Sequence, residues 1–479
     1  MSDRPATPSS TVPEDGMDRH LRFHENGTPC EWGESYRPGG FHPVQLGDIL
    51  DGRYEILSKL GYGSFSTVWL AADSSSRTFV AIKIVTARIS QSAQSELSLY
   101  RLLASAEPEK PRNAHNLVGL LASFELVGPN GQHTCFVVEV MGPNLSDMLR
   151  SQEFQVGHPF DDDFCHRYPK HLSKRILKEV LHGLRFLHSN KIVHGDVHKG
   201  NILVNVLLPQ YKPKSLENLR QPLDQARPLE RLDGKKDVWA PPYLLPPANL
   251  RSYVSTELDQ FAKLTDFGQA FRRGEVPERI VTPDYLRAPE TILRLVNTIG
   301  TGIDIWSFGC LLFELLTGSN LFMVSTMFAE GETLDDVHLI QLTEVLGPLP
   351  EQVFHAWRRG SCYFDANWRR SYNPEGDESL ENDFSSDSGS SESEDGLPES
   401  DDGESTFSDD DADTSNSEAD LARVRLSEPL EEQFRRKKPG DIDEVEEKQI
   451  LHLLRWILQY DPVKRPSAEE ILRHEWFQT

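Results

Sequence analysis

The order of apolar and polar positions changes character about a third of the way along the chain. Three runs between Tyr54 and Val85, YEILSKL, STVWLAAD and FVAIKIV, are rich in β-branched and aromatic residues and are separated by turns, which is typical of strands. Apolar residues at helical spacing predict a helix over 94–104. The run CFVVEVM, from Cys135 to Met141, is a short apolar stretch between turn residues and predicts a buried strand.

Helical spacing dominates from Leu172 onward. The run LSKRILKEVLHGLRFLHSN predicts a long amphipathic helix, and further helices are predicted by DIWSFGCLLFELLTG, DDVHLIQLTEVLG and EEKQILHLLRWILQY. A small β-rich part followed by a larger helical part predicts an α+β protein with two lobes and a cleft between them.

Polar stretches set the expected domain limits. The polar N-terminus reads as a disordered tail, and structure is expected to begin near Tyr36. Pro-rich pieces between Asn205 and Gln260 indicate an irregular insertion into the second lobe. The expected parts are a tail at 1–34, an N-terminal extension at 35–53, a β-rich lobe at 54–141 and a helical lobe at 142–479, which is interrupted at 205–260 and 374–420.

One acidic segment dominates the charge of the chain. Residues 374–420 hold 19 Asp and Glu, 14 Ser and Thr, and no Lys, Arg or His, so we expect this tract to be disordered and phosphorylatable. The formal net charge is −25 for the whole chain and −6 without the tract. A basic surface for direct binding of nucleic acid is therefore not expected.

Cysteines and apolar runs indicate an intracellular protein. The five cysteines are scattered and form no CxxC pair, which argues against a disulfide framework and a zinc site and favours buried, reduced thiols. The first residues contain no apolar stretch of the kind found in secretory signals, and no run approaches 18 apolar residues. We expect no membrane span.

Four short motifs point to phosphate chemistry. Gly61 and Gly63 sit between two predicted strands, where a glycine pair allows the backbone to approach phosphates; the alternative is an ordinary hairpin turn. Lys83 follows on the next strand, and Glu96 lies 13 residues later on the predicted helix, where it is placed to pair with that lysine. Alone, Lys83 would read as a surface lysine.

The other two motifs supply hard oxygen ligands. Asp196 and Asn201 lie in HGDVHKGN, between a predicted helix and an apolar run, and Asp266 lies in LTDFG. A carboxylate–amide–carboxylate set suits a nucleotide with Mg²⁺ and leaves one carboxylate to accept a hydroxyl proton. The order of the four motifs predicts an ATP–Mg²⁺ site.

From about Tyr54 to its end, the chain resembles the eukaryotic protein kinases. Beside the four motifs, RAPE at 287–290 matches the end of a kinase activation segment, and DIWSFG at 304–309 matches the buried helix that follows. The resemblance implies the bilobal protein kinase fold. It also implies that Arg465, in the run RPS, pairs with Glu290 in the protein interior.

Within the kinases the chain is most similar to the serine/arginine-protein kinases. The similarity rests on YRPGGFHPV, GD, GRY, LGYGSFSTVWL and NGQHTC, the last leading into VVEVMG, and on the insertion that splits the kinase core. It implies an ATP-dependent serine/threonine kinase of Arg/Ser-rich proteins such as splicing factors. We accordingly expect a monomer in the cytoplasm and nucleus, with ATP and Mg²⁺ as cofactors and no direct contact with nucleic acid or membrane.

The resemblance also implies roles for individual residues. The catalytic residues are Asp196 as base, His198 and Lys83, and the metal ligands are Asn201 and Asp266. Adenine binds along 139–141, with Val138 guarding the back of the pocket. The expected nucleotide-binding residues are Leu60, Gly61, Gly63, Val68, Ala81, Lys83, Glu96, Glu139 and Met141.

The chain departs from the family at the catalytic loop. Gly195 replaces the family's arginine or threonine, so we expect a kinase that is active without phosphorylation of its activation segment. His198 replaces a lysine that contacts the transferring phosphate, and Pro283 replaces a threonine, with Thr282 displaced by one position. The loop HGDVHKGN also resembles the HGDxHxxN loop of aminoglycoside kinases, which use histidine at this place.

The chain matches the docking groove of the family only in part. The family feeds arginine-rich substrates through an acidic docking groove, of which Glu344 matches one carboxylate, while Val337 stands at another acidic position. Three other functions therefore remain open on the sequence: a kinase of other protein substrates, a pseudokinase scaffold and a small-molecule kinase. Asp304 and the pair of Glu290 with Arg465 argue against the last.

Overall fold

The computed structural model describes residues 8, 21–24, 29–106, 115–151, 154–156, 165–324, 331–370 and 427–478. The chain divides into two compact units. The first unit comprises Met1–Thr291, Leu295–Leu321 and Lys437–Thr479, and the second comprises Ile292–Arg294 and Phe322–Arg436.

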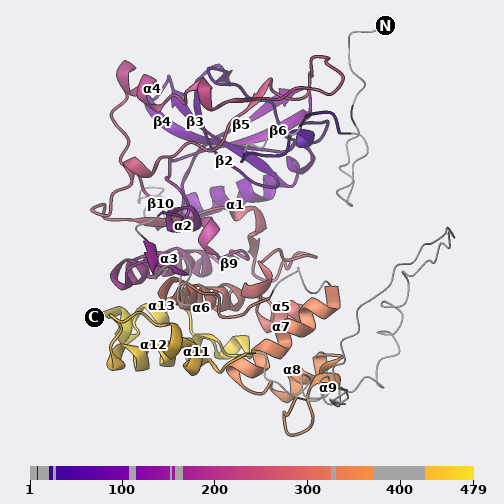
Figure 1. Cartoon of the computed structure of the whole chain (residues 1–479), viewed down its shortest axis with the longest axis vertical. Coiled ribbons are helices and arrows are strands. Elements are labelled where there is room, and N and C mark those ends of the chain that lie inside the picture. Colours follow the sequence, from indigo (N-terminus) through magenta and orange to yellow (C-terminus); the bar gives the residue numbers. More distant parts are fainter. Residues whose placement is uncertain are drawn as a thin grey trace, which may run out of the picture. The chain divides into compact units, whose positions relative to one another are not determined.

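The β-rich part of the first unit is one antiparallel sheet with strand order β1-β2-β3-β4-β6-β5 (Figure 1). Helix α1 (Ala93–Ala106) lies along it, and its Tyr100 ring packs 6.1 Å from Phe136 of the sheet. The strands are β1 (Ile49–Leu50), β2 (Tyr54–Tyr62), β3 (Ser66–Asp73), β4 (Thr78–Val85), β5 (Leu120–Gly128) and β6 (Gly131–Val138).

The predicted strands and the first helix are confirmed, with one shifted boundary. Strand β6 ends at Val138, whereas the apolar run predicted strand as far as Met141. The chain leaves the sheet there because Gly142 donates its N–H to the carbonyl of Val204, which belongs to the helical part. Residues 139–141 are therefore the connector between the two parts.

The helical part of the first unit is built around α6 (Gly302–Thr317), whose residues from Ile303 to Thr317 are all buried. At Gly309 a Cβ would lie 2.5 Å from Cγ2 of Ile457, so glycine permits α6 and α12 to pack closely. The other helices are α2 (Leu145–Leu149), α3 (Lys170–Ser189), α5 (Pro289–Ile292), α12 (Glu444–Ile457), α13 (Ala468–Leu472) and α14 (Glu475–Gln478).

Short strand pairs position the loops of this part. Strand β9 (Ile192–Val193) pairs with β14 (Phe271–Arg272), and β10 (Ile202–Val204) pairs with β13 (Ala262–Leu264). The remaining pair, β7 (Gln155–Val156) with β8 (Cys165–His166), joins α2 to α3. The predicted helices are present, so the first unit has the α+β, two-lobed protein kinase fold expected from the sequence.

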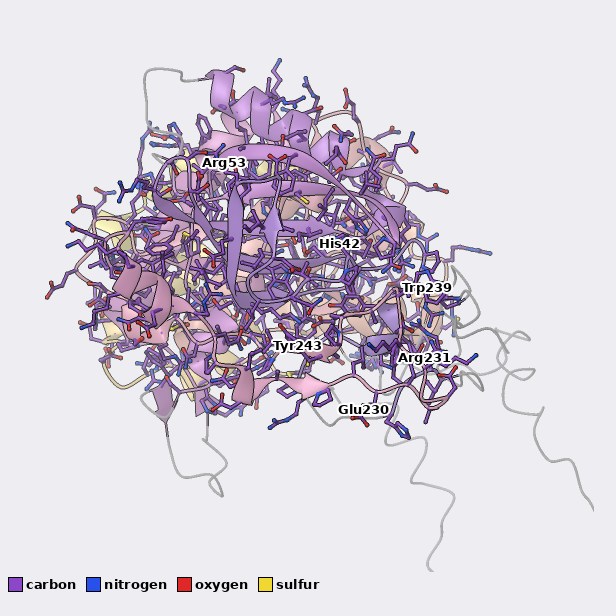
Figure 2. The ribbon with its side chains drawn as sticks, turned by 90° about the horizontal axis from the view of Figure 1, so that it is seen from above. His42, Arg53, Glu230, Arg231, Trp239 and Tyr243 are labelled. Atoms are coloured by element: carbon purple, nitrogen blue, oxygen red, sulfur yellow. The ribbon has the colours of Figure 1, made fainter. Side chains whose placement is uncertain are left out.

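The insertion at 205–260 is better ordered than the sequence predicts. It forms α4 (Pro213–Leu219), β11 (Arg227–Pro228) and β12 (Tyr243–Leu244) and packs on the β-rich part, where Leu245 joins the core cluster of Ile56. Figure 2, viewed from above, labels residues of the insertion and of the N-terminal segment beside it: Glu230, Arg231, Trp239 and Tyr243, and His42 and Arg53.

The expected end of the N-terminal tail at residue 34 is wrong. Residues 21–24 and 29–34 belong to the folded unit, with Phe23 and Glu31 buried. Phe23 forms a β-bridge to Arg231 of the insertion, and the Glu31 carboxylate binds the buried ammonium of Lys59 on β2. These partners lie far away in sequence, so local polarity could not predict them.

The second unit is helical, with α7 (Gly331–Leu346), α8 (Glu351–Ala356), α9 (Gly360–Tyr363) and α11 (Leu430–Lys437). Buried Asp336 of α7 joins three of its segments: it accepts hydrogen bonds from Trp357 Nε1 at 2.6 Å and Tyr363 Oη at 3.1 Å, and pairs with Arg359 Nε at 3.1 Å. The acidic tract at 374–420 lies outside the described residues. In the described part of the chain, no helix is long and apolar enough to cross a membrane.

Candidate active site

The sheet brings the expected nucleotide-binding residues together at one turn and three strands. Leu60 and Gly61 lie near the end of β2, Gly63 lies in the turn, and Val68 lies on β3 opposite Lys83. A Cβ at either glycine would meet nothing within 4 Å, so no neighbouring atom crowds the turn at these two positions. Ala81 of β4 pairs with Val138 of β6, next to the connector.

Lys83 joins the sheet, α1 and the LTDFG motif through two carboxylates. Its Nζ lies 3.0 Å from Glu96 Oε1 and 2.8 Å from Asp266 Oδ1, so the predicted pair with Glu96 is present. Burial alone lowers the pKa of Lys83, but Asp266 and Glu96 outweigh it and raise that pKa. The Lys83 ammonium in turn lowers the pKa of Asp266 to about 2, so this carboxylate stays charged.

Asp196, the base expected from the sequence, has one carboxylate oxygen that accepts a hydrogen bond and one that does not. Asp196 Oδ2 accepts a hydrogen bond from Asn201 Nδ2 at 2.8 Å, while buried Oδ1 has no hydrogen-bond partner among the residues that the structure describes. A buried carboxylate oxygen without a donor is costly unless a ligand supplies one. Oδ1 is therefore suited to accept a proton from a bound hydroxyl.

His198 lies beside this base in a fixed orientation. Its Nδ1 accepts the N–H of Gly200 at 3.0 Å, which places the ring proton on Nε2, and Nε2 lies 3.4 Å from Asp196 Oδ2. Lys199, the next residue, turns away and pairs with Glu314 of α6. The histidine thus presents a neutral N–H donor where the family has a charged lysine.

Asp304 of α6 holds the catalytic loop in place, a role that sequence reasoning missed. Its carboxylate is 1% exposed and accepts the N–H groups of His194 and Gly195, each at 2.8 Å. The sequence signal was a carboxylate inside a predominantly apolar helix, which requires buried donors. Gly195 adopts a left-handed φ of +77°, which favours glycine at this position.

A column of rings connects α1 with the catalytic loop. Phe267, 1% exposed, packs its ring centroid 5.0 Å from Tyr100 of α1 and 5.6 Å from His194. Because Tyr100 lies one helical turn after Glu96, this packing also fixes the carboxylate that Lys83 binds. The lysine, the helix and the LTDFG motif are therefore assembled together.

The connector between the two parts presents free backbone groups. The Glu139 carbonyl and the Met141 N–H, predicted to bind adenine, have no hydrogen-bond partner in the described residues. The Glu139 side chain turns inward, accepting the Gly119 N–H at 2.9 Å and binding Lys263 of β13 at 2.6 Å. This buried pair was not foreseen, because Lys263 reads as a polar residue of a short strand.

Two contacts fix the activation segment without a phosphate. Thr282 Oγ1 donates to the Gly195 carbonyl at 2.6 Å. Glu290 and Arg465 form a bidentate pair, with Nη1–Oε1 and Nη2–Oε2 distances of 2.6 and 2.8 Å, and both side chains are at most 2% exposed. The predicted burial of this pair is confirmed.

Comparison with known proteins agrees with this geometry. A protein kinase domain model matches residues 54–212 and 247–477, so the chain belongs to the protein kinase family. It shares 32% identity over 356 residues with "Serine/threonine-protein kinase SRPK" of Physarum polycephalum, covering 71% of this chain and 77% of that protein. The chain is a serine/threonine kinase of this SRPK type, and the family binds ATP with a divalent metal ion.

Two further relatives are also named as protein kinases. "SRSF protein kinase 3" of Homo sapiens is 36% identical over 176 residues, which cover 36% of this chain and 29% of that protein. A serine/threonine protein kinase of Aspergillus fumigatus is 28% identical over 355 residues, covering 74% of this chain and 78% of its own length. The unmatched stretch between residues 212 and 247 falls within the insertion.

Proposed function

We propose that the chain transfers the terminal phosphoryl group of ATP, with Mg²⁺, to serine hydroxyls in Arg/Ser-rich proteins. The names of the relatives support the substrate class. The free buried Oδ1 of Asp196 carries the catalytic assignment, because it stands ready to accept a hydroxyl proton while Asn201 fixes the other oxygen.

The donor set suits the cofactor. Asp266 uses Oδ1 for Lys83, which leaves Oδ2 for a cation, and Asn201 donates from Nδ2, which leaves its amide oxygen for a second contact. Mg²⁺ in proteins is commonly held by one or two carboxylates together with the phosphates of a nucleotide, whose charge it neutralises. Lys83 would orient the phosphates, and Asp196 would accept the hydroxyl proton as the new bond forms.

His198 fits a role as a neutral donor in this transfer. Its Nε2–H stands beside Asp196, so it can hydrogen-bond the incoming hydroxyl or the transferring phosphoryl group without adding a charge. The charge that the family lysine provides would then come from Lys83 and the metal ion.

One observation favours a different protein substrate as the second candidate. Glu344, which matches a docking carboxylate of the family, is 6% exposed and accepts the N–H of Ser427 at 2.8 Å. Asp336, next to the altered position Val337, is bound by Trp357 and its neighbours. Because both carboxylates are engaged within the second unit, a substrate recognised only around its acceptor serine is also compatible.

Transfer of labelled phosphate from ATP decides between these functions. The acceptors are an Arg-Ser repeat peptide, a Lys-Ser peptide of equal charge and length, and a mixture of free small-molecule alcohols and aminoglycosides. Preference for the Arg-Ser peptide supports the proposal, whereas equal use of both peptides supports the second candidate. Absence of transfer to any acceptor, with ATP still bound, contradicts both.

A further inference from the structure

A pocket of about 320 Å³ lies wholly within the second unit and has no part in the mechanism described above. One wall is the end of α7, with Thr343 and Glu344, and the turn that follows this helix. The other wall consists of Phe364, Trp368 and Arg370, which lie beyond α9. The pocket is therefore a candidate binding site apart from the nucleotide and the base.

The Arg370 side chain brings buried N–H groups without acceptors to this pocket. Its Nε and Nη1 are buried and have no hydrogen-bond partner among the residues that the structure describes. Its Cζ lies 5.7 Å from the centre of the Phe364 ring and 5.9 Å from the centre of the Tyr363 ring. An aromatic ring attracts a cation, but it does not supply the oxygen acceptor that buried N–H groups normally have. An anion in the pocket would supply it.

A well-defined loop presents this guanidinium. Phe364 and Arg370 form a β-bridge across the loop, and Asp365 Oδ1 accepts the N–H of Arg369 at 2.8 Å. Trp368 has a left-handed φ of +59°, which is unfavourable for a residue with a side chain. Such a conformation persists only where the surrounding contacts impose it, and it is common at binding sites. The loop therefore holds Arg370 in place before a ligand arrives.

The lining of the pocket favours a ligand that carries both signs of charge. Arg370 contributes a cation, Glu344 contributes a carboxylate that is 6% exposed, and Trp368 contributes an indole ring. A guanidinium binds phosphate oxygens through N–H donors of fixed geometry, and an arginine of the ligand can stack on an indole ring. A phosphoserine with an arginine beside it combines these features, whereas Glu344 would oppose a wholly acidic segment. The proposed reaction makes this ligand from an Arg-Ser repeat.

We propose that this pocket binds a phosphoserine flanked by arginine, so that the second unit holds Arg-Ser segments that the enzyme has already phosphorylated. The identity of the ligand rests on the proposed function. The family takes arginine through carboxylates, of which Glu344 matches one, whereas here the buried donors of Arg370 select a phosphate. Binding of the phosphorylated segment retains the substrate for further transfers, because tethering raises the local concentration of its remaining serines.

The test measures the binding of three labelled peptides to the full chain without ATP, by fluorescence anisotropy. The first peptide is an Arg-Ser repeat with one phosphoserine, the second is the same repeat without phosphate, and the third keeps the phosphoserine but has glutamine in place of every arginine. The wild type should bind the first peptide about tenfold more tightly than the second, which corresponds to about 1.4 kcal/mol. The third should bind more weakly than the first.

Substitutions at two neighbouring arginines make the result specific. Arg370→Gln should abolish the difference in Kd between the first two peptides and have little effect on the affinity for the unphosphorylated repeat. Arg369→Gln removes the same charge from the adjacent, exposed position and should keep the wild-type difference. Thermal melting checks that both variants fold. If Arg370→Gln does not fold, Arg370→Lys replaces it and should reduce the difference, because lysine keeps the charge but lacks the planar fork.

Three outcomes overturn the inference: equal affinity of the wild type for the first two peptides, a preference for phosphoserine that persists in a folded Arg370 variant, or equal binding of the first and third peptides. A preference that appears only after deletion of 374–420 also overturns it, and favours the acidic tract of this chain as the occupant of the pocket. These binding results are independent of the proposed function, which is judged by phosphate transfer to the unphosphorylated repeat.

Discussion

At the scale of single residues, the catalytic loop holds the activation segment through a backbone carbonyl and not through a charged side chain. Gly195 stands where the family has a larger residue, and a Cβ there would lie 3.0 Å from the Gln269 carbonyl. Its own carbonyl accepts the Thr282 hydroxyl, which ties the activation segment to the loop. This contact supports the expectation that no phosphate on the segment is needed for activity.

Asp266→Ala should abolish phosphoryl transfer and leave the fold intact. The side chain is 49% exposed, so its loss removes a cation ligand and a partner of Lys83 with little effect on packing. Labelled-phosphate transfer and thermal melting check the two parts of the expectation. Asp224→Ala, at an exposed position of the insertion, is the matched control and should retain activity. Appreciable transfer by the Asp266 variant would refute its assignment.

At the scale of elements, buried ion pairs and packed rings attach the activation segment and the N-terminal segment to the helices and strands of the first unit. The activation segment is anchored at its end by Glu290, which Arg465 holds from beyond α12. The Arg465 guanidinium also stacks 4.9 Å from the Trp306 ring of α6. The N-terminal segment is anchored in a similar way, by Glu31 on Lys59 and by the burial of His42 against the β5–β6 hairpin.

Arg465→Ala should destabilise the protein strongly. Removal of one partner leaves the Glu290 carboxylate buried and unpaired, which typically costs about 3–5 kcal/mol. Denaturant unfolding gives the change in free energy. Arg473→Ala breaks a surface pair with Glu469 in which Arg473 is 71% exposed, and we expect it to cost about 1 kcal/mol or less. Equal effects of the two variants would contradict the buried anchor.

His42 should make stability depend on pH. Burial, followed by the neighbouring His133, lowers the pKa of His42 from 6.5 to about 4 in the folded state. Between these values the unfolded chain binds a proton that the folded chain does not, so stability falls as the pH drops through this window. The loss amounts to about 3 kcal/mol on completion at low pH.

The His42→Phe variant tests this expectation. It removes the titrating ring while filling the same space, so its unfolding free energy should fall less than that of wild type between pH 7 and pH 4. His355→Gln, at a side chain that is 74% exposed, should follow the wild-type profile. Parallel profiles for wild type and the His42 variant would show that His42 does not titrate in this range.

At the scale of the whole molecule, charge is concentrated in one tract while the kinase core is close to neutral. The tract at 374–420 carries 19 carboxylates, and the rest of the chain has a formal net charge of −6. Such a tract is expected either to compete with the rest of the enzyme for arginine-rich substrates or to concentrate them nearby.

Deletion of 374–420 should leave the fold and the affinity for ATP unchanged and alter the KM for Arg-Ser peptides at low salt. The difference from wild type should vanish at high salt, because the Debye length is about 8 Å at physiological ionic strength and shorter above it. Steady-state kinetics across a salt series measures this. A replacement of the tract by a Gly/Ser linker of equal length controls for chain length. An unfolded deletion variant, or no change at any salt, would rule out the electrostatic role.

The sequence by itself predicted most of the main elements and a candidate catalytic set. Hydrophobic patterns predicted strands β2, β3, β4 and β6 of the sheet and helices α1, α3, α6, α7 and α12, because each pattern is set by residues that are neighbours along the chain. Lys83, Asp196 and Asp266 were predicted as site residues because phosphate chemistry restricts the residue types at those motifs. These signals are local and therefore readable without a structure.

Only the tertiary structure decided which distant residues meet. The pairs of Lys199 with Glu314, Lys263 with Glu139 and Lys59 with Glu31 each join segments far apart in sequence, and each charge alone reads as a solvated surface group. The packing of the insertion and the N-terminal segment on the sheet belongs to the same class. Burial creates these contacts, because a charge withdrawn from water must find a partner, and the fold alone determines which partner is within reach.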